Sequence, residues 1–259
     1  MNSSNRFQLP EDIWEHIPPR RDAIMVFGSA ARGDSDKHSD IDVLVLRRGT
    51  SFSERRGQYN IAYYSPAHLR QMAENGSLFV RHLLDDGQIL EDPSNVLVNI
   101  LQCYIRPASY VSFRNEICAV LPLFDISQER FEQFPKRWFD ASLFCLRSLI
   151  YIAADEEDTL SFSIKKLASD TGWEEAKFLL AARQFEAKQF LKGFTKAIEF
   201  IEAECKKECS NPYLTVEAYC LNEYEDHPLV LSLTLRLLLG GRTPISYDLF
   251  SPVHWVSGT

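Results

Sequence analysis

Short apolar runs near the start of the chain constrain its fold more than any other feature. Three runs, at residues 23–27, 41–46 and 59–64, are rich in β-branched or aromatic residues, and each ends at turn residues. This length and composition are typical of β-strands. Helical patterns follow at residues 66–75 and 77–86. We therefore predict a small α/β (α+β) domain in which helices cover a mixed sheet.

From about residue 94 onward, apolar residues recur instead at three- and four-residue spacing, as in amphipathic helices. This spacing predicts helices at residues 96–105, 110–121, 128–154, 164–171, 173–187 and 190–209. One of them carries aromatic residues that we expect in its core, namely Phe131, Phe134, Trp138, Phe139 and Phe144. We therefore predict two domains, at residues 1–92 and 93–259. The second is an all-helical bundle, and a ligand is expected in the cleft between the two.

Composition and charge narrow the class of protein. The chain has 259 residues, of which 45% are hydrophobic and 25% are charged, as in ordinary globular proteins. No run approaches the roughly 18 apolar residues of a membrane-spanning helix, and the first residues lack the apolar core of a secretion signal. We therefore expect a soluble, cytoplasmic protein with no membrane partner. The net charge of −8 disfavours a long nucleic acid as the partner.

Six cysteines are scattered along the chain and do not form the dense framework of a small disulfide-stapled domain. Cys205 and Cys209 are one helical turn apart, with Cys220 and His227 downstream. One interpretation of this group is a zinc site, although no Cys-x-x-Cys pair is present. The other, which the spacing favours, is a set of ordinary, half-buried helix cysteines.

One stretch combines groups that bind a phosphate with groups that bind a cation. Asp40 and Asp42 stand at the start of the second predicted strand, on one face and roughly 6–7 Å apart along it. Two such carboxylates repel each other unless a cation lies between them, and Mg²⁺ binds one or two carboxylates together with phosphate oxygens. Gly28-Ser29, at the end of the first strand, offers backbone N–H groups and a hydroxyl to phosphates.

The complete arrangement is a strand, Gly-Ser, ten residues, Asp-x-Asp and a second strand. It resembles the signature of the DNA polymerase β-like nucleotidyltransferase superfamily, and most closely the minimal and antibiotic nucleotidyltransferases, over about residues 22–92. The resemblance implies that the Gly-Ser turn, with Arg32 and Lys37, binds the phosphates of an NTP. It also implies that Asp40 and Asp42 are catalytic and bind Mg²⁺ (or Mn²⁺).

The activity implied by the resemblance is transfer of a nucleoside monophosphate, AMP from ATP, to a hydroxyl group of a small molecule, a protein or RNA. The superfamily normally adds a third acid on a later strand. The matching strand here is predicted at residues 59–64, and the matching position holds Asn60, whose amide does not accept a proton at neutral pH. Three interpretations stay open: a shifted register, another acid such as Asp85 or Asp86, or a slow or inactive enzyme.

Asn60 also keeps a second function open. The alternative is a catalytically weakened relative that binds a nucleotide or a partner protein in a regulatory, toxin–antitoxin or phage-defence role.

Asp85 and Asp86 are interpreted more simply as solvent-facing residues at a helix end. The segment 76–90 resembles the helix-to-strand ending of bacterial nucleotidyltransferase domains, and we expect His82 to belong to an apolar helix stripe within it.

Overall fold

The computed structural model describes residues 10–35 and 39–240. These residues divide into two compact units, which meet in sequence between Pro107 and Ala108. The division lies later than the boundary expected after residue 92. The reason is helix α4 (Val96–Leu101), because three of its residues belong to the hydrophobic core of the first unit.

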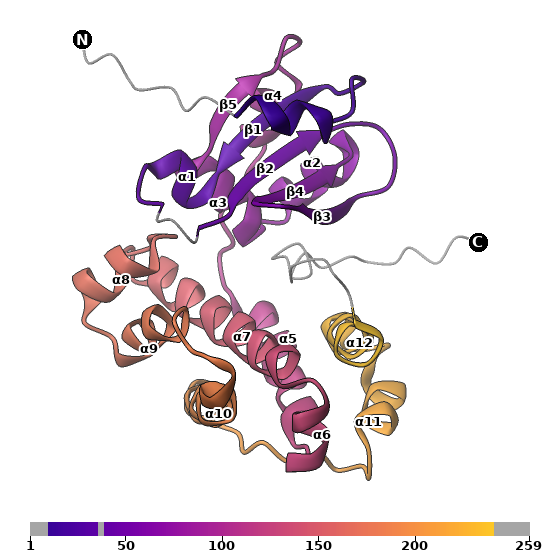
Figure 1. Cartoon of the computed structure of the whole chain (residues 1–259), viewed down its shortest axis with the longest axis vertical. Helices are drawn as coiled ribbons and strands as arrows, with labels where there is room; N and C mark the ends of the chain where they lie inside the picture. The colour runs from indigo at the N-terminus through magenta and orange to yellow at the C-terminus, as the bar shows by residue number, and fades with distance from the viewer. Residues whose placement is uncertain (1–9, 36–38, 241–259) are drawn as a thin grey trace. The chain divides into compact units, whose positions relative to one another are not determined.

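The first unit is built on a five-stranded sheet with strand order β3-β4-β2-β1-β5 (Figure 1). The strands are β1 (Ala23–Phe27), β2 (Ile41–Leu46), β3 (Phe52–Arg56), β4 (Tyr59–Tyr64) and β5 (Gln88–Glu91). β2 and β4 are parallel, whereas the other neighbouring pairs are antiparallel. The predicted mixed sheet is therefore confirmed, and the three apolar runs coincide with β1, β2 and β4.

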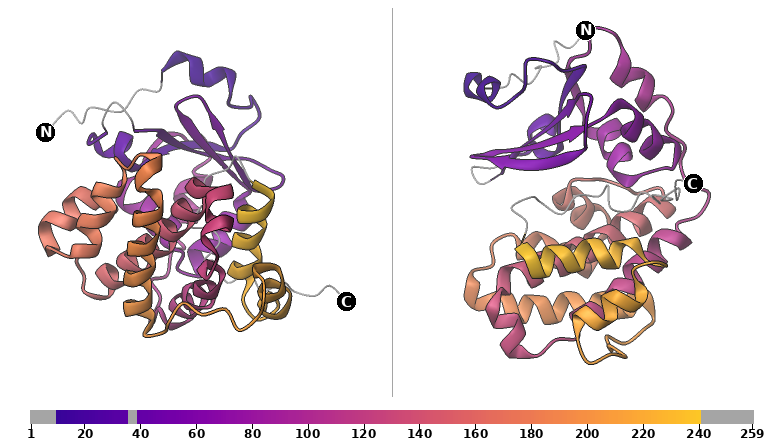
Figure 2. Two further views of the ribbon diagram at one scale, coloured as in Figure 1. Left: turned by 60° about the horizontal axis from the view of Figure 1, so that its bottom comes forward. Right: turned by 90° about the vertical axis from the view of Figure 1, so that its right-hand side faces the viewer.

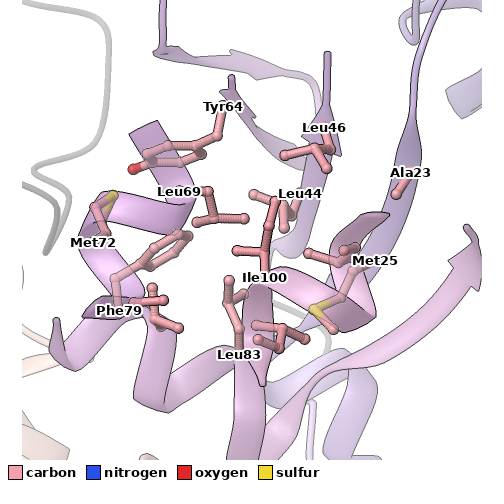
Figure 3. Close-up of a cluster of buried hydrophobic side chains, with 14 of the residues drawn as sticks. Ala23, Met25, Leu44, Leu46, Tyr64, Leu69, Met72, Phe79, Leu83 and Ile100 are labelled. Atoms are coloured by element: carbon pink, nitrogen blue, oxygen red, sulfur yellow. The ribbon is translucent and has the colours of Figure 1, made fainter. Parts of the chain in front are cut away.

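Both faces of the sheet are covered, which explains why the central strands are almost wholly apolar. The helices beside the sheet are α1 (Gly28–Arg32), α2 (Pro66–Glu74), α3 (Leu78–Asp86) and α4, preceded by the 3₁₀-helix η1 (Glu11–Glu15). Residues of α2, α3 and α4 pack on one face, and Figure 3 shows Met25 and Leu44 of the sheet gathered with Leu83 and Ile100 of these helices. Residues of η1 and α1 pack on the other face.

The second unit is helical, as predicted, and Figure 2 shows it from two further directions. Its helices are α5 (Val111–Val120), α6 (Gln128–Gln133), α7 (Pro135–Glu156), α8 (Ile164–Thr171), α9 (Glu174–Ala182), α10 (Phe190–Cys205), α11 (Val216–Glu223) and α12 (Pro228–Leu235). Short turns η2 (Leu121–Phe124) and η3 (Ala187–Gln189) lie between them, and the π-helical turn η4 (Arg236–Gly240) follows α12. Within residues 10–35 and 39–240, no helix is long and apolar enough to cross a membrane.

The single helix predicted at residues 128–154 is in fact two helices, α6 and α7. Phe134 separates them with non-helical φ and ψ of −145° and 60°, and Pro135 begins α7. Proline disfavours helical geometry in the residue before it but suits the first turn of a new helix, which explains the break. The other predicted core aromatic residues are buried, but Phe134 at the break is 42% exposed, so its assignment to the core was wrong.

The cysteines of the second unit do not gather around a metal. Cys205 forms a disulfide with Cys118, which joins the end of α10 to α5. The Cys209 thiol donates to the backbone oxygen of Leu121 at 3.2 Å, and Cys220 is buried in α11. In the described part of the chain, no three His, Cys, Asp or Glu side chains are placed to hold a metal ion, so the zinc interpretation is not supported.

Candidate functional site

The turn between β1 and α1 brings the backbone of the chain against an acidic side chain. The chain leaves β1 at Phe27 and enters α1 through Gly28, whose φ of +71° lies in the left-handed region that favours glycine. A Cβ atom at this position would lie 2.8 Å from Oδ2 of Asp42. Both the backbone conformation and the close approach therefore require glycine at position 28.

Asp42 meets this turn because β2 runs antiparallel to β1. The register of the two strands places Phe27 opposite Asp42, so the acid lies beside the start of α1. Asp42 is half-buried. Burial raises the pKa of its carboxyl group, and the nearby Asp40 carboxylate acts in the same direction. Oδ1 of Asp40 accepts a hydrogen bond from Nη2 of Arg55 at 2.6 Å in an exposed ion pair.

Asn60 lies beside both acids. β4 runs parallel to β2, and the register pairs Asn60 with Asp42. The amide Nδ2 of Asn60 donates to Oδ1 of Asp42 at 3.1 Å and to Oδ2 of Asp40 at 3.3 Å. Asn60 therefore lies at the position predicted for it beside the two acids, and a shifted register of β4 does not explain the missing third acid.

Asp85 and Asp86, the other candidates for the third acid, have different surroundings. Asp85 pairs with Arg81 at 3.0 Å on α3. Asp86 is only 12% exposed and contacts Arg32 and His82, so the expectation that it faces solvent was wrong. His82 is part of the helix side that packs on Phe27, but it also reaches Asp86. The spacing of four residues between His82 and Asp86 was the signal available in the sequence.

Arg32 and Lys37 are the two cationic side chains that were predicted to bind phosphates. Arg32 ends α1 and donates from Nε to Asp34 at 3.2 Å and from Nη1 to Asp86 at 2.5 Å. It lies close enough to Asp42 to lower the pKa of that carboxyl group, although burial has the larger and opposite effect. Lys37 lies outside the described residues.

The oxygen atoms of this site fit a hard cation. Among the described residues the set contains two carboxylates and not three, which agrees with the lack of any group of three acidic, histidine or cysteine ligands. The third oxygen is Oδ1 of Asn60, which is buried and has no hydrogen-bond partner among the described residues. Mg²⁺ takes one or two carboxylates, neutral amide oxygens and phosphate oxygens, so Asp40, Asp42 and Asn60 suit a cation that is shared with a phosphate ligand.

Part of the first unit is similar to a known protein family. Residues 11–74 match the family described as a nucleotidyltransferase domain, so the first unit carries such a domain. A solved structure of a nucleotidyltransferase-like protein from Exiguobacterium sibiricum 255-15 is 14% identical, with 83% of this chain and 76% of that chain covered and a TM-score of 0.31. No curated protein matches the chain.

Proposed function

We propose that the nucleotidyltransferase domain of this chain transfers a nucleoside monophosphate, AMP from ATP, to a hydroxyl group of an acceptor. The observation that carries the proposal is the contact between the Gly28 turn and Asp42, at which a Cβ atom would lie 2.8 Å from the carboxylate. The groups suited to phosphates and the groups suited to a cation therefore lie side by side. The acceptor is a small molecule, a protein or RNA.

The α1 turn supplies the phosphate contacts. The first backbone N–H groups of a helix have no partner within it, and here they belong to Gly28 and the residues just after it. The hydroxyl of Ser29, which is half-buried, adds a donor. Arg32 adds positive charge at the other end of the turn. Hydrogen bonds from such donors are stronger when the acceptor oxygen is charged, so the turn suits a triphosphate.

Asp40 and Asp42 would hold Mg²⁺ (or Mn²⁺). The Asn60 amide, whose nitrogen now faces both acids, would turn its oxygen toward the ion to serve as a third ligand. When bound, such an ion would neutralise and orient the phosphates. In its absence, the N–H groups of Asn60 hold the two carboxylates together. Burial raises the pKa of the Asp42 carboxyl group, so ionisation is less favourable here than in water, and a cation would offset this cost.

Transfer requires that the acceptor hydroxyl lose a proton. The acceptor oxygen bonds to the α-phosphorus, the bond to pyrophosphate breaks, and the proton leaves to a carboxylate or to solvent. Asn60 does not accept this proton. Of the three polar side chains proposed for this site, Asp40 and Asp42 are the two that could accept it, and we therefore expect slow turnover.

Two measurements test the proposal. Asp40→Asn and Asp42→Asn should abolish Mg·ATP binding in calorimetry and leave the fold intact, whereas Asp85→Asn should bind as the wild type does. Pyrophosphate release should then be followed for each NTP with cationic small molecules, protein hydroxyls and tRNA as acceptors. Unchanged affinity in both acid variants would show that the site is wrongly assigned. Binding without any release would fit the weakened, regulatory relative instead.

A further inference from the structure

Two side chains of α3, one helical turn apart, contact both ends of the α1 segment. We call His82 and Asp86 the α3 clamp. Both lie outside residues 11–74, which match the nucleotidyltransferase family. α1 and α3 belong to the same unit and lie next to each other (Figure 1).

At the end of α1, the clamp holds a charged side chain. Oδ2 of Asp86 lies 2.5 Å from Nη1 of Arg32 and 3.1 Å from Nε2 of His82. The side chains of Asp86 and His82 are each 12% exposed, and that of Arg32 is 19% exposed. Because solvent is largely excluded, these contacts are screened less than surface ion pairs.

At the start of α1, the clamp contacts the residue that precedes the turn. The ring of His82 packs edge-on against the ring of Phe27, with centroids 5.5 Å apart. Phe27 lies opposite Asp42 in the sheet. Gln88, just after α3, also donates to the backbone oxygen of Ala31 within α1.

The α1 segment needs such support for two reasons. It has only five residues, so it is too short to be stable without tertiary contacts. In addition, the Arg32 guanidinium lies within electrostatic reach of Asp42. Without Asp86, the more exposed Asp34, which pairs with Arg32 at 3.2 Å, would oppose the attraction of the two acids less strongly. The guanidinium would then be drawn toward Asp40 and Asp42, where a cation is expected to bind.

We propose that Asp86, held by His82, is a positioning residue that keeps Arg32 at the end of α1 and away from Asp40 and Asp42. It thereby keeps the backbone of Gly28–Arg32 in the conformation that receives phosphates. This inference rests on the proposed function for its consequence in nucleotide binding, but the contact itself is testable in the ligand-free protein.

The first experiment measures hydrogen exchange of the free protein. Asp86→Asn should accelerate amide exchange in residues 28–34 by about tenfold, because a hydrogen bond between charged groups is lost and the segment opens more often. Asp85→Asn is the matched control, because it makes the same change on the same helix at a residue that is 33% exposed. His82→Gln should accelerate the same amides less strongly, and it serves as the second variant if Asp86→Asn folds poorly.

The second experiment measures Mg·ATP affinity in a double-mutant cycle. Asp86→Asn should weaken binding by about tenfold, because Arg32 then competes with the cation. Arg32→Gln combined with Asp86→Asn should bind no worse than Arg32→Gln alone, since Asp86 acts through Arg32. A residue that only stabilised the fold would weaken binding equally in both backgrounds.

The outcomes separate this inference from the proposed function. If exchange in residues 28–34 is the same in Asp86→Asn and Asp85→Asn, the positioning role is overturned. If exchange changes as expected but the wild type binds no Mg·ATP, Asp86 keeps its structural role and the proposed function fails. If the wild type binds Mg·ATP and Asp86→Asn binds equally well, the inference fails and the proposed function stands.

Discussion

Among single residues, Asn60 bears most directly on turnover. Its amide hydrogen-bonds to both Asp40 and Asp42, where a third carboxylate would otherwise lie. Asn60→Asp should increase pyrophosphate release by about 10²–10⁴-fold, the contribution of a positioned general base. In the metal-free protein the same change should lower Tm, because three acids then crowd one site.

The control for this prediction is Asn222→Asp, which makes the same chemical change on an exposed face of α11. It should change neither turnover nor the Mg²⁺ dependence of Tm. A wild type that already turns over rapidly, with no gain from Asn60→Asp, would show that another group takes the acceptor proton.

The glycine at the turn gives a second prediction. Gly28 and Gly33 both have φ in the left-handed region, but only Gly28 has a neighbour within 4 Å of a built Cβ atom. Gly33→Ala should therefore destabilise the protein only through backbone strain, whereas Gly28→Ala should also displace Asp42 and lower Mg·ATP affinity.

Ser29→Ala should weaken Mg·ATP binding by about 1–3 kcal/mol and leave Tm unchanged. Calorimetry and thermal melts of the three variants check this, and equal affinities would place the nucleotide elsewhere.

Asp86 gives a prediction for pH. Burial alone would raise the pKa of its carboxyl group, but the hydrogen bond and charge of His82 and the charge of Arg32 outweigh burial and hold the pKa below the usual 3.8. The ionised form therefore stabilises the fold above the usual pKa, and this contribution is lost as the pH falls through the folded-state pKa. Urea unfolding should show that Asp86→Asn is less stable than the wild type near pH 7 and that the difference shrinks below about pH 4. A difference that grows toward acid pH would contradict the assignment.

At the scale of elements, α10 crosses α7 closely at a glycine. A Cβ atom at Gly193 would lie 2.6 Å from Cε2 of Phe139 and 2.9 Å from the ring of Phe185. Alanine would gain about 1 kcal/mol of helix propensity, but overpacking a core costs about 1–3 kcal/mol. Gly193→Ala should therefore lower Tm, measured against Lys192→Ala at the exposed neighbouring position. A rise in Tm would mean that the helices separate at little cost.

The sequence predicted elements well where local patterns determine them. β1, β2 and β4 coincide with apolar runs, and Asp42 lies beside the Gly28 turn because the pairing of β1 with β2 places it opposite Phe27. β3 was not predicted, because its edge sequence FSERR is mostly polar and lacks an apolar run. The pairing of Arg32 with Asp86 was also missed, since the two residues are 54 positions apart and no local pattern joins them.

At the scale of the whole molecule, the two compact units are stabilised by different means. The first would bind Mg·ATP, whereas the second carries the Cys118–Cys205 disulfide, which spans 87 positions. In the chain-entropy view a bond closing such a loop contributes about 4–5 kcal/mol. Scanning calorimetry should therefore show two transitions, of which Mg·ATP raises one and a thiol reductant lowers the other.

The variants Asp42→Asn and Cys118→Ser identify the two transitions. The first should remove only the response to Mg·ATP, and the second only the response to reductant. A single transition that moves with both additions would show that the two units unfold together.

The position of Asn60 within the sheet has a consequence for how a sample ages. Asparagine converts slowly to aspartate when the next backbone nitrogen attacks the side-chain amide, which requires a backbone that can bend. Asn60 and Ile61 lie in β4, which pairs with a strand on each side, and Ile61 is β-branched and fully buried. The sheet therefore protects the one amide whose hydrolysis would supply the missing acid. A stored preparation should keep its original mass at this residue and should not become more active with time.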